Sequence, residues 1–330
     1  MSAAPLLELR NLSTHYVSAR GTCVVRAVDE VSLTLEAGST LGIVGESGSG
    51  KSTLALTILR LLPPAAHITG GEILFEGDDL RTKSDVEMRR IRGKRIAMIL
   101  QDPMASLNPL FTVGDQVAEP LRVHEGVGRA GAWSRAKDLL KSVRISAPES
   151  RVGEYPHQMS GGMRQRIVGA IAISCAPRLL IADEPTTSLD LTIQAQYLNL
   201  LRDLQRQHEL ALIFITHNLG IVAKMCDQVA VMYAGRLVEW GPVTRIFDAP
   251  AHPYTQALLG SIPRMGGDAR ERLTAIEGQP PDLAAPPSGC AFHPRCPHVM
   301  AQCREQAPPE TVLAPRHTTR CWLSVPAPAR

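Results

Sequence analysis

The sequence predicts an α/β fold built around a mainly parallel sheet. Short apolar stretches, rich in leucine or β-branched residues, alternate with helical patterns along most of the chain, as parallel sheets with crossover helices require. A glycine-rich loop also lies between an apolar strand and an apolar helix. The predicted strands are Leu6–Leu12, Val31–Leu35, Thr40–Val44, Ile96–Leu100, Leu179–Ala182, Leu212–Thr216 and Val229–Ala234.

The closely spaced early strands predict a small antiparallel β-subdomain beside the main sheet. The distribution of proline and cysteine residues indicates a domain boundary near Asp248. Fourteen of the 25 prolines follow Asp248, and four of the seven cysteines follow Gly289. We therefore expect a regular α/β domain over 1–248 and a loop-rich extension over 249–330.

Composition excludes several function classes. The chain of 330 residues is 44% apolar and 20% charged, which is typical of a globular protein. Its net charge of +3 is too small and too evenly spread to indicate nucleic-acid binding. No apolar run has the length of a membrane span, and the N-terminus lacks the pattern of a secretion signal. We expect a cytosolic chain whose membrane role, if any, comes through partner chains.

The glycine-rich loop that follows Thr40–Val44 is a phosphate-binding P-loop, and the predicted helix Leu54–Leu62 follows it. Its backbone N–H groups and the following helix N-terminus bind the phosphates of a nucleotide. The lysine reaches the β- and γ-phosphates, and the serine after it binds Mg²⁺. The residues are Gly45, Glu46, Ser47, Gly48, Ser49, Gly50, Lys51, Ser52 and Thr53.

Polar residues at the carboxyl ends of other predicted strands complete this site. Asp183 is placed to hold Mg²⁺ through water, and Glu184 is placed to polarise the attacking water as a general base. Gln101, at the end of another strand, is placed to contact Mg²⁺ or the attacking water, and His217 ends a further strand in the same way. Taken alone, such a histidine is more often a surface residue. Tyr16 is a candidate for stacking on adenine, but a lone tyrosine in such a β-region is more often part of a half-buried core.

Ser160, Gly161 and Gly162 open a second helix, Met163–Ser174, whose uncovered N-terminal N–H groups form another anion site. Two helix N-termini that approach one γ-phosphate from opposite sides are expected to belong to two chains.

In order, these motifs and Ser188-Leu189-Asp190 resemble the motif set of ABC-transporter ATPase subunits over about residues 6–245. The resemblance implies a helical subdomain at about 104–175 and a head-to-tail dimer with two ATP molecules between the chains. It implies that Tyr16 stacks on adenine, Asp190 lies at the nucleotide, Gln101 couples to the membrane subunits and His217 senses the γ-phosphate. Met163 and Asn218 depart from the commoner glutamine and aspartate, and neither change removes a phosphate ligand.

The extension contains four cysteines, Cys290, Cys296, Cys303 and Cys321. Their spacing leaves open an iron–sulfur cluster, zinc, or unliganded thiols. The segment His252-Pro253-Tyr254 and the Pro-Arg-Cys-Pro pattern resemble the extension of dipeptide and oligopeptide importer ATPases, which implies a [4Fe–4S] cluster.

This resemblance predicts an ATP-hydrolysing subunit for peptide uptake, peripheral at the cytoplasmic face of the cell membrane. The implied partners are a second, homologous ATPase, two integral membrane permeases and an extracytoplasmic substrate-binding protein. Nickel, glutathione and other small-solute importers share this architecture and form the alternative. A soluble ABC ATPase is disfavoured because the chain has one cassette and no heptad run.

Overall fold

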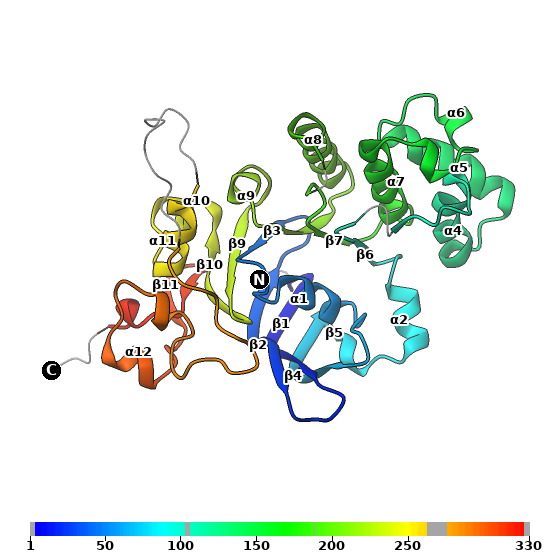
Figure 1. Cartoon of the computed structure of the whole chain (residues 1–330). Coiled ribbons are helices and arrows are strands. Elements are labelled where there is room, and N and C mark those ends of the chain that lie inside the picture. Colours follow the sequence, from blue (N-terminus) through cyan, green and yellow to red (C-terminus); the bar gives the residue numbers. More distant parts are fainter. Residues whose placement is uncertain (1–3, 103–105, 188, 263–275, 327–330) are drawn as a thin grey trace. The chain divides into compact units, whose positions relative to one another are not determined.

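The computed structural model describes residues 4–102, 106–187, 189–262 and 276–326. It divides into two compact units, each described here by itself. The first comprises the described parts of Met1–Leu35, Thr40–Arg81 and Ile215–Arg330, and the second comprises Glu36–Ser39 and Thr82–Phe214. Both units mix strands and helices, which confirms the predicted α/β class (Figure 1).

The first unit contains the predicted antiparallel β-subdomain. Its strands β1 (Leu7–Val17), β2 (Val24–Leu35), β4 (Ala66–Phe75) and β5 (Asp78–Asp79) form a sheet in the order β2-β1-β4-β5. β1 pairs antiparallel with both β2 and β4. Leu7, Leu9 and Leu12 of β1 are buried, which places one face of this sheet in the core.

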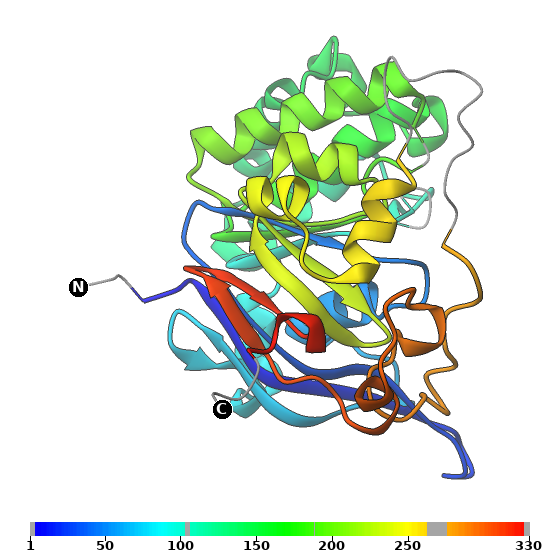
Figure 2. The same cartoon turned by 90° about the vertical axis from the view of Figure 1, so that its left-hand side faces the viewer.

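A second run of strands in this unit carries the P-loop. It consists of β3 (Thr40–Val44), β9 (Gln228–Tyr233), β10 (Arg236–Pro242), β12 (His317–Thr319) and β11 (Thr311–Ala314), in that order. β3 and β9 are parallel and apolar, as expected for buried central strands. β10, β12 and β11 continue antiparallel, so the extension adds two strands that the sequence did not predict (Figure 2).

The helices of this unit are short. They are α1 (Lys51–Ile58), α9 (Leu219–Met225), α10 (Val243–Asp248), α11 (Pro253–Gly260) and α12 (Ala301–Glu305), with single 3₁₀ turns at Leu80–Thr82, His293–Arg295 and Trp322–Ser324. α1 ends four residues before the predicted Leu62. The left-handed backbone of Arg60 (φ 52°) and the two prolines that follow explain this early end.

The second unit combines parallel strands with a group of helices. The strands β8 (Ala211–Ile215), β7 (Leu179–Asp183) and β6 (Ile96–Ile99) lie in that order, with β6 and β7 parallel. The helices are α2 (Asp85–Ile91), α4 (Val113–Glu125), α5 (Arg129–Ser142), α6 (Pro148–Arg151), α7 (Gly161–Ile173) and α8 (Leu191–Gln207), with a 3₁₀ turn at Pro156–Gln158. α4, α5 and α7 pack on one another. None of the described helices is long and apolar enough to span a bilayer.

Candidate functional site

The loop between β3 and α1 has the backbone of a P-loop. Gly45, Gly48 and Gly50 have φ values of 153°, 79° and 101°, which glycine adopts without strain. A Cβ on Gly45 would lie 2.2 Å from the Met232 carbonyl oxygen, and one on Gly50 would lie 2.0 Å from that of Ala27. The glycines are therefore required by close backbone packing as well as by their φ values.

Lys51 opens α1 and its side chain folds back over the loop. Its Nζ lies 2.8 Å from the carbonyl oxygens of both Gly45 and Glu46 and 3.3 Å from Ser49 Oγ. Ser52 is exposed beside it, and the Thr53 hydroxyl lies 3.4 Å from the Tyr16 hydroxyl. The first turn of α1 thus supplies an ammonium group and two hydroxyls, and Tyr16 of β1 adds an aromatic ring beside them, which suits a Mg²⁺-bound nucleoside triphosphate.

Glu46 is held by residues that the sequence did not connect with the P-loop. Its backbone N–H donates to the Tyr254 hydroxyl at 2.9 Å. Its carboxylate accepts hydrogen bonds from both Nη atoms of Arg295, at 2.7 and 3.0 Å. Both partners belong to the extension. No local sequence pattern predicts a contact between residues that lie more than 200 positions apart.

His217 follows β8 and is exposed. Asn218, which takes the place of the commoner aspartate, is the N-cap of α9 and accepts from the backbone N–H groups of Gly220 and Ile221 at 3.0 and 3.3 Å. Asparagine is among the best N-cap residues, so this departure from the family pattern keeps a helix cap.

In the second unit, β7 ends at Asp183, which is buried. Glu184 follows with a left-handed backbone (φ 45°). Its Oε2 accepts from Gln101 Nε2 at 3.1 Å and from the Thr187 hydroxyl at 2.9 Å. The structure thus brings Gln101 and Glu184 together, as expected for the ends of neighbouring parallel strands.

Ser160 is the N-cap of α7, and its hydroxyl accepts from the Met163 N–H at 3.3 Å. Gly161 is exposed, whereas a Cβ on Gly162 would lie 2.7 Å from Ile193 of α8. Asp190 is the N-cap of α8 and accepts from two backbone N–H groups at 3.0 and 3.1 Å. Its carboxylate therefore caps α8, and the position at the nucleotide that the resemblance implies stays a prediction. Ser188 lies outside the described residues.

The four cysteines of the extension are free thiols. Cys303 and Cys321 are buried, and the Cys290 N–H donates to the Cys303 carbonyl at 2.8 Å. Burial, with smaller contributions from the other three thiols, raises the pKa of Cys290 to about 11. The described residues contain no group of three or more His, Cys, Asp or Glu side chains that could hold a metal ion. The predicted iron–sulfur cluster is therefore not supported by this arrangement.

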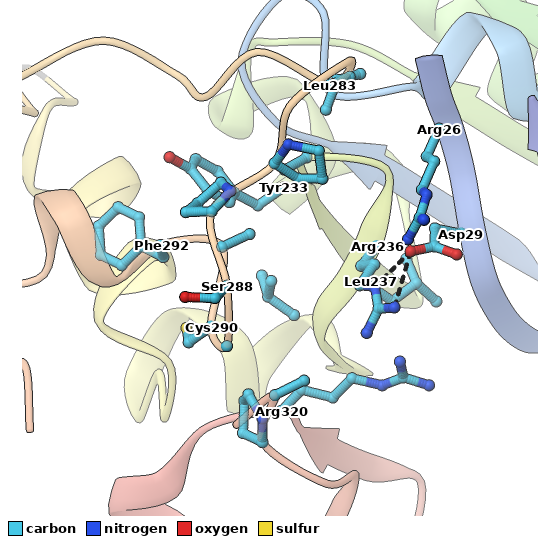
Figure 3. Close-up of a pocket in the computed structure, with 18 of the residues that line it drawn as sticks. Arg26, Asp29, Tyr233, Arg236, Leu237, Leu283, Ser288, Cys290, Phe292 and Arg320 are labelled. Atoms are coloured by element: carbon cyan, nitrogen blue, oxygen red, sulfur yellow. Dashed lines mark hydrogen bonds and ion pairs between the residues drawn. The ribbon is translucent and has the colours of Figure 1, made fainter. Parts of the chain in front are cut away.

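A cavity of about 440 Å³ lies between the extension and the strands β9 and β10 (Figure 3). Arg236 on its wall donates to the Asp29 carboxylate, with Nε at 2.9 Å and Nη2 at 2.8 Å. Phe292 and Cys290 of the extension line the opposite part. His252 also lines it, and burial lowers the pKa of this histidine to about 3. Its imidazole is therefore neutral at neutral pH.

Comparisons with known proteins agree with this geometry. The family model "ABC transporter" matches residues 28–187, and "Oligopeptide/dipeptide transporter, C-terminal region" matches residues 238–303. The chain is 50% identical to the dipeptide transport ATP-binding protein of Bacillus subtilis, covering 96% of this chain and 94% of that one. It is 47% identical to the oligopeptide transport ATP-binding protein of Haemophilus influenzae, covering 97% and 98%.

The chain also resembles solved structures of ABC ATP-binding cassettes. A dimeric ATP-binding cassette in a post-hydrolysis state with ADP and phosphate matches with a TM-score of 0.64 and 26% identity, over 72% of this chain and 98% of that one. The P-loop geometry, the near full-length relatives and this structural match lead to one conclusion. The chain belongs to the family of ABC-transporter ATP-binding proteins that carry the oligopeptide/dipeptide transporter C-terminal region.

Proposed function

We propose that this chain binds and hydrolyses ATP to drive the import of dipeptides or oligopeptides, as a peripheral subunit at the cytoplasmic face of the membrane. The observation that carries the proposal is identity of about 50% to dipeptide and oligopeptide transport ATP-binding proteins over nearly the whole chain, extension included. The proposed partners are two permeases, a substrate-binding protein and a second, different ATPase of the same family.

The proposed roles follow the chemistry of each residue. The backbone N–H groups of 45–50 and the Lys51 ammonium bind the phosphates, and Ser52, Asp183 and Gln101 would hold Mg²⁺ directly or through water. The bound ion would neutralise charge on the phosphates. Glu184 accepts a proton from the attacking water. Its bonds to Gln101 and Thr187 orient the carboxylate before the nucleotide arrives.

The helix that Ser160 caps is proposed to complete the site of the partner ATPase rather than its own. Its exposed Gly161 leaves the first backbone N–H groups of α7 accessible to an anion. His217 is proposed to contact the γ-phosphate and Tyr16 the adenine ring. The division into an ATPase domain over 1–248, with helices at about 104–175, and an extension over 249–330 belongs to this proposal.

The test is reconstitution of the complete transporter in lipid vesicles. Uptake of labelled di- and oligopeptides that requires ATP, and that Glu184→Gln abolishes, is the expected result. A transporter that takes up Ni²⁺ or glutathione under the same conditions, and no peptide, would contradict the peptide assignment while leaving the ATPase assignment intact.

The cysteine group is a separate and finer part of the proposal. We propose that Cys290, Cys296, Cys303 and Cys321 bind a [4Fe–4S] cluster, and the support for this is four cysteines within one short extension. Such a cluster requires all four side chains to turn toward one centre, and it would cross-link the extension. Iron and sulfide analysis of anaerobically purified protein tests this. Stoichiometric zinc without iron would refute the cluster and assign the site to zinc. The absence of iron, sulfide and zinc would refute a metal site.

A further inference from the structure

Glu46, the second residue of the P-loop, carries a negative charge in a loop whose ligand is a polyanion. Its own carbonyl oxygen accepts from the Lys51 ammonium at 2.8 Å. An unneutralised carboxylate at this position repels the phosphates of ATP, and a loop that moves loses the fixed N–H groups that bind them. The residues that hold Glu46 therefore bear directly on ATP affinity.

Arg295 neutralises this carboxylate with a paired hydrogen bond from a nearly inaccessible position. The Arg295 side chain is 4% exposed, and its two Nη atoms lie 2.7 and 3.0 Å from the two carboxylate oxygens of Glu46. Such two-bond pairs fix geometry as well as charge. The hydrogen bonds that Arg295 donates to Glu46 raise the pKa of Arg295 above its ordinary value, so the guanidinium stays charged.

The extension also fixes the position of the arginine. Its Nε donates to the Glu277 carbonyl at 2.9 Å, and Nη1 lies 3.3 Å from the Tyr233 hydroxyl. Its Cγ lies 3.3 Å from the position of a Cβ on Gly278, whose φ is 78°. The guanidinium is thus supported on several sides before it meets Glu46, and little conformational freedom is left to lose.

Tyr254 holds the backbone of the same residue from a second direction. Its side chain is fully buried, and its hydroxyl accepts from the Glu46 N–H at 2.9 Å. The ring packs against Tyr233 and Phe292, with centroids 4.5 and 5.3 Å apart. These rings give the hydroxyl a fixed location, so the extension sets where the first part of the P-loop lies.

We propose that Arg295 and Tyr254 of the C-terminal extension are positioning residues of the P-loop, which neutralise and fix Glu46 so that the loop binds ATP tightly. Neither residue is a catalytic residue. Their effect appears in the affinity for ATP, because the groups that carry out hydrolysis lie elsewhere in the chain. The extension is thereby a part of the nucleotide site and not only an appendage to it.

A double-mutant cycle on the full-length protein tests the proposal. The dissociation constant of a fluorescent ATP analogue is measured with Mg²⁺ for the unmodified chain, Arg295→Gln, Glu46→Gln and the double variant. We expect Arg295→Gln to weaken binding about tenfold, which corresponds to 1.4 kcal/mol. The double variant should bind at least as tightly as Arg295→Gln, because no uncompensated carboxylate remains.

The matched control is Arg304→Gln, which removes an exposed arginine of the extension. Its dissociation constant should stay within about twofold of the unmodified value. In the ATPase assay of the assembled transporter, Arg295→Gln should raise KM by the same factor as the dissociation constant and leave kcat within about twofold. Arg295→Lys, which keeps the charge but not the paired bonds, should recover part of the affinity.

Two results would overturn the proposal. One is a dissociation constant of Arg295→Gln that stays within twofold of the value for the unmodified chain, or that rises no further than the value for the Arg304→Gln control. The other is a double variant whose loss equals the product of the two single losses, because independent effects mean that the arginine does not act through Glu46.

A third variant keeps the test valid if Arg295→Gln loosens the extension. Tyr254→Phe deletes one hydroxyl and keeps the ring packing, and we expect it to weaken ATP binding about threefold, with unchanged resistance of the extension to limited proteolysis. Unchanged affinity in this variant would show that the Tyr254 hydroxyl does not position the loop and would overturn that half of the proposal.

Discussion

Glu239 is the buried carboxylate on which the geometry of the extension depends, and its replacement by glutamine should be strongly destabilising. Its side chain is fully inaccessible. One oxygen accepts from the Ala251 N–H at 2.8 Å and from His317 Nε2 at 2.9 Å, and the other accepts from the His252 N–H at 2.9 Å. This one side chain therefore joins β10, β12 and the turn that begins α11.

The magnitude follows from these three bonds. In Glu239→Gln an amide NH₂ replaces one carboxylate oxygen and faces a donor, so at least one hydrogen bond to a charged group is lost, at about 1.5–3 kcal/mol. The remaining bonds change from charge-assisted to neutral and weaken by about half. We therefore expect the free energy of unfolding to fall by about 3 kcal/mol.

Urea denaturation at pH 7 measures this change, because Trp240 adjoins the substituted residue and reports on its surroundings by fluorescence. Glu305→Gln, an exposed glutamate of α12, is the matched control and should change stability by less than about 0.5 kcal/mol. A loss in Glu239→Gln as small as that in the control would refute the reasoning that these bonds hold the extension in place.

Three further predictions concern catalysis, acid stability and thiol reactivity. Glu184→Gln should reduce phosphate release by the assembled transporter about 10²-fold or more while ATP binding stays within about threefold, and near-normal turnover would exclude Glu184 as the base. His252 has a folded pKa of about 3 against an ordinary 6.5, so the unfolded chain binds a proton first as the pH falls and stability is lost from pH 6.5 downward. The loss at pH 5 is about 2 kcal/mol in urea titrations, and a His252→Asn variant with the same pH dependence would contradict it. With the pKa of Cys290 raised to about 11, about 0.1% is thiolate at pH 8. Alkylation of the metal-free protein, followed by peptide mass spectrometry, should therefore modify the exposed Cys23 well before the half-buried Cys290, and the reverse order would contradict the raised pKa of Cys290.

The sequence was sufficient wherever the physical signal is local. The strand Thr40–Val44 was predicted with its observed limits because four apolar or β-branched residues around Gly42 directly precede the P-loop glycine Gly45. Ser160 was predicted to open a helix for a similarly local reason, because a serine hydroxyl can accept from the N–H three residues ahead, as it does here.

Elements with mixed composition were missed. β4 contains a histidine, a threonine and two adjacent glycines between Ala66 and Phe75, which resemble a loop and not a strand. β10 contains Glu239 and ends in a proline. Because a charged residue and a proline are untypical of a central strand, the sequence pattern did not predict this strand. The buried position of Glu239 is explained only by residues distant in the sequence that bond to it, such as His317.

Long-range contacts at the site left no trace in the sequence. Arg295 and Glu46 are 249 residues apart, and each has an obvious local explanation, one as part of a cysteine-rich pattern and the other as a P-loop residue. Asp190 also caps α8, which its position before a helix makes a local feature, and its contact with the nucleotide stays a prediction.

The pairing of β12 with β10 has a consequence for how this chain can be shortened. Glu239 and Trp240 of β10 lie opposite Thr319 and Thr318 of β12, and the Arg320 N–H donates to the Val238 carbonyl at 2.8 Å. A protein truncated after Asp248 would expose this side of β10 as a bare strand edge, which is a template for association with other chains. An ATPase domain expressed without its extension should therefore aggregate, unless charged or proline substitutions along β10 block that edge.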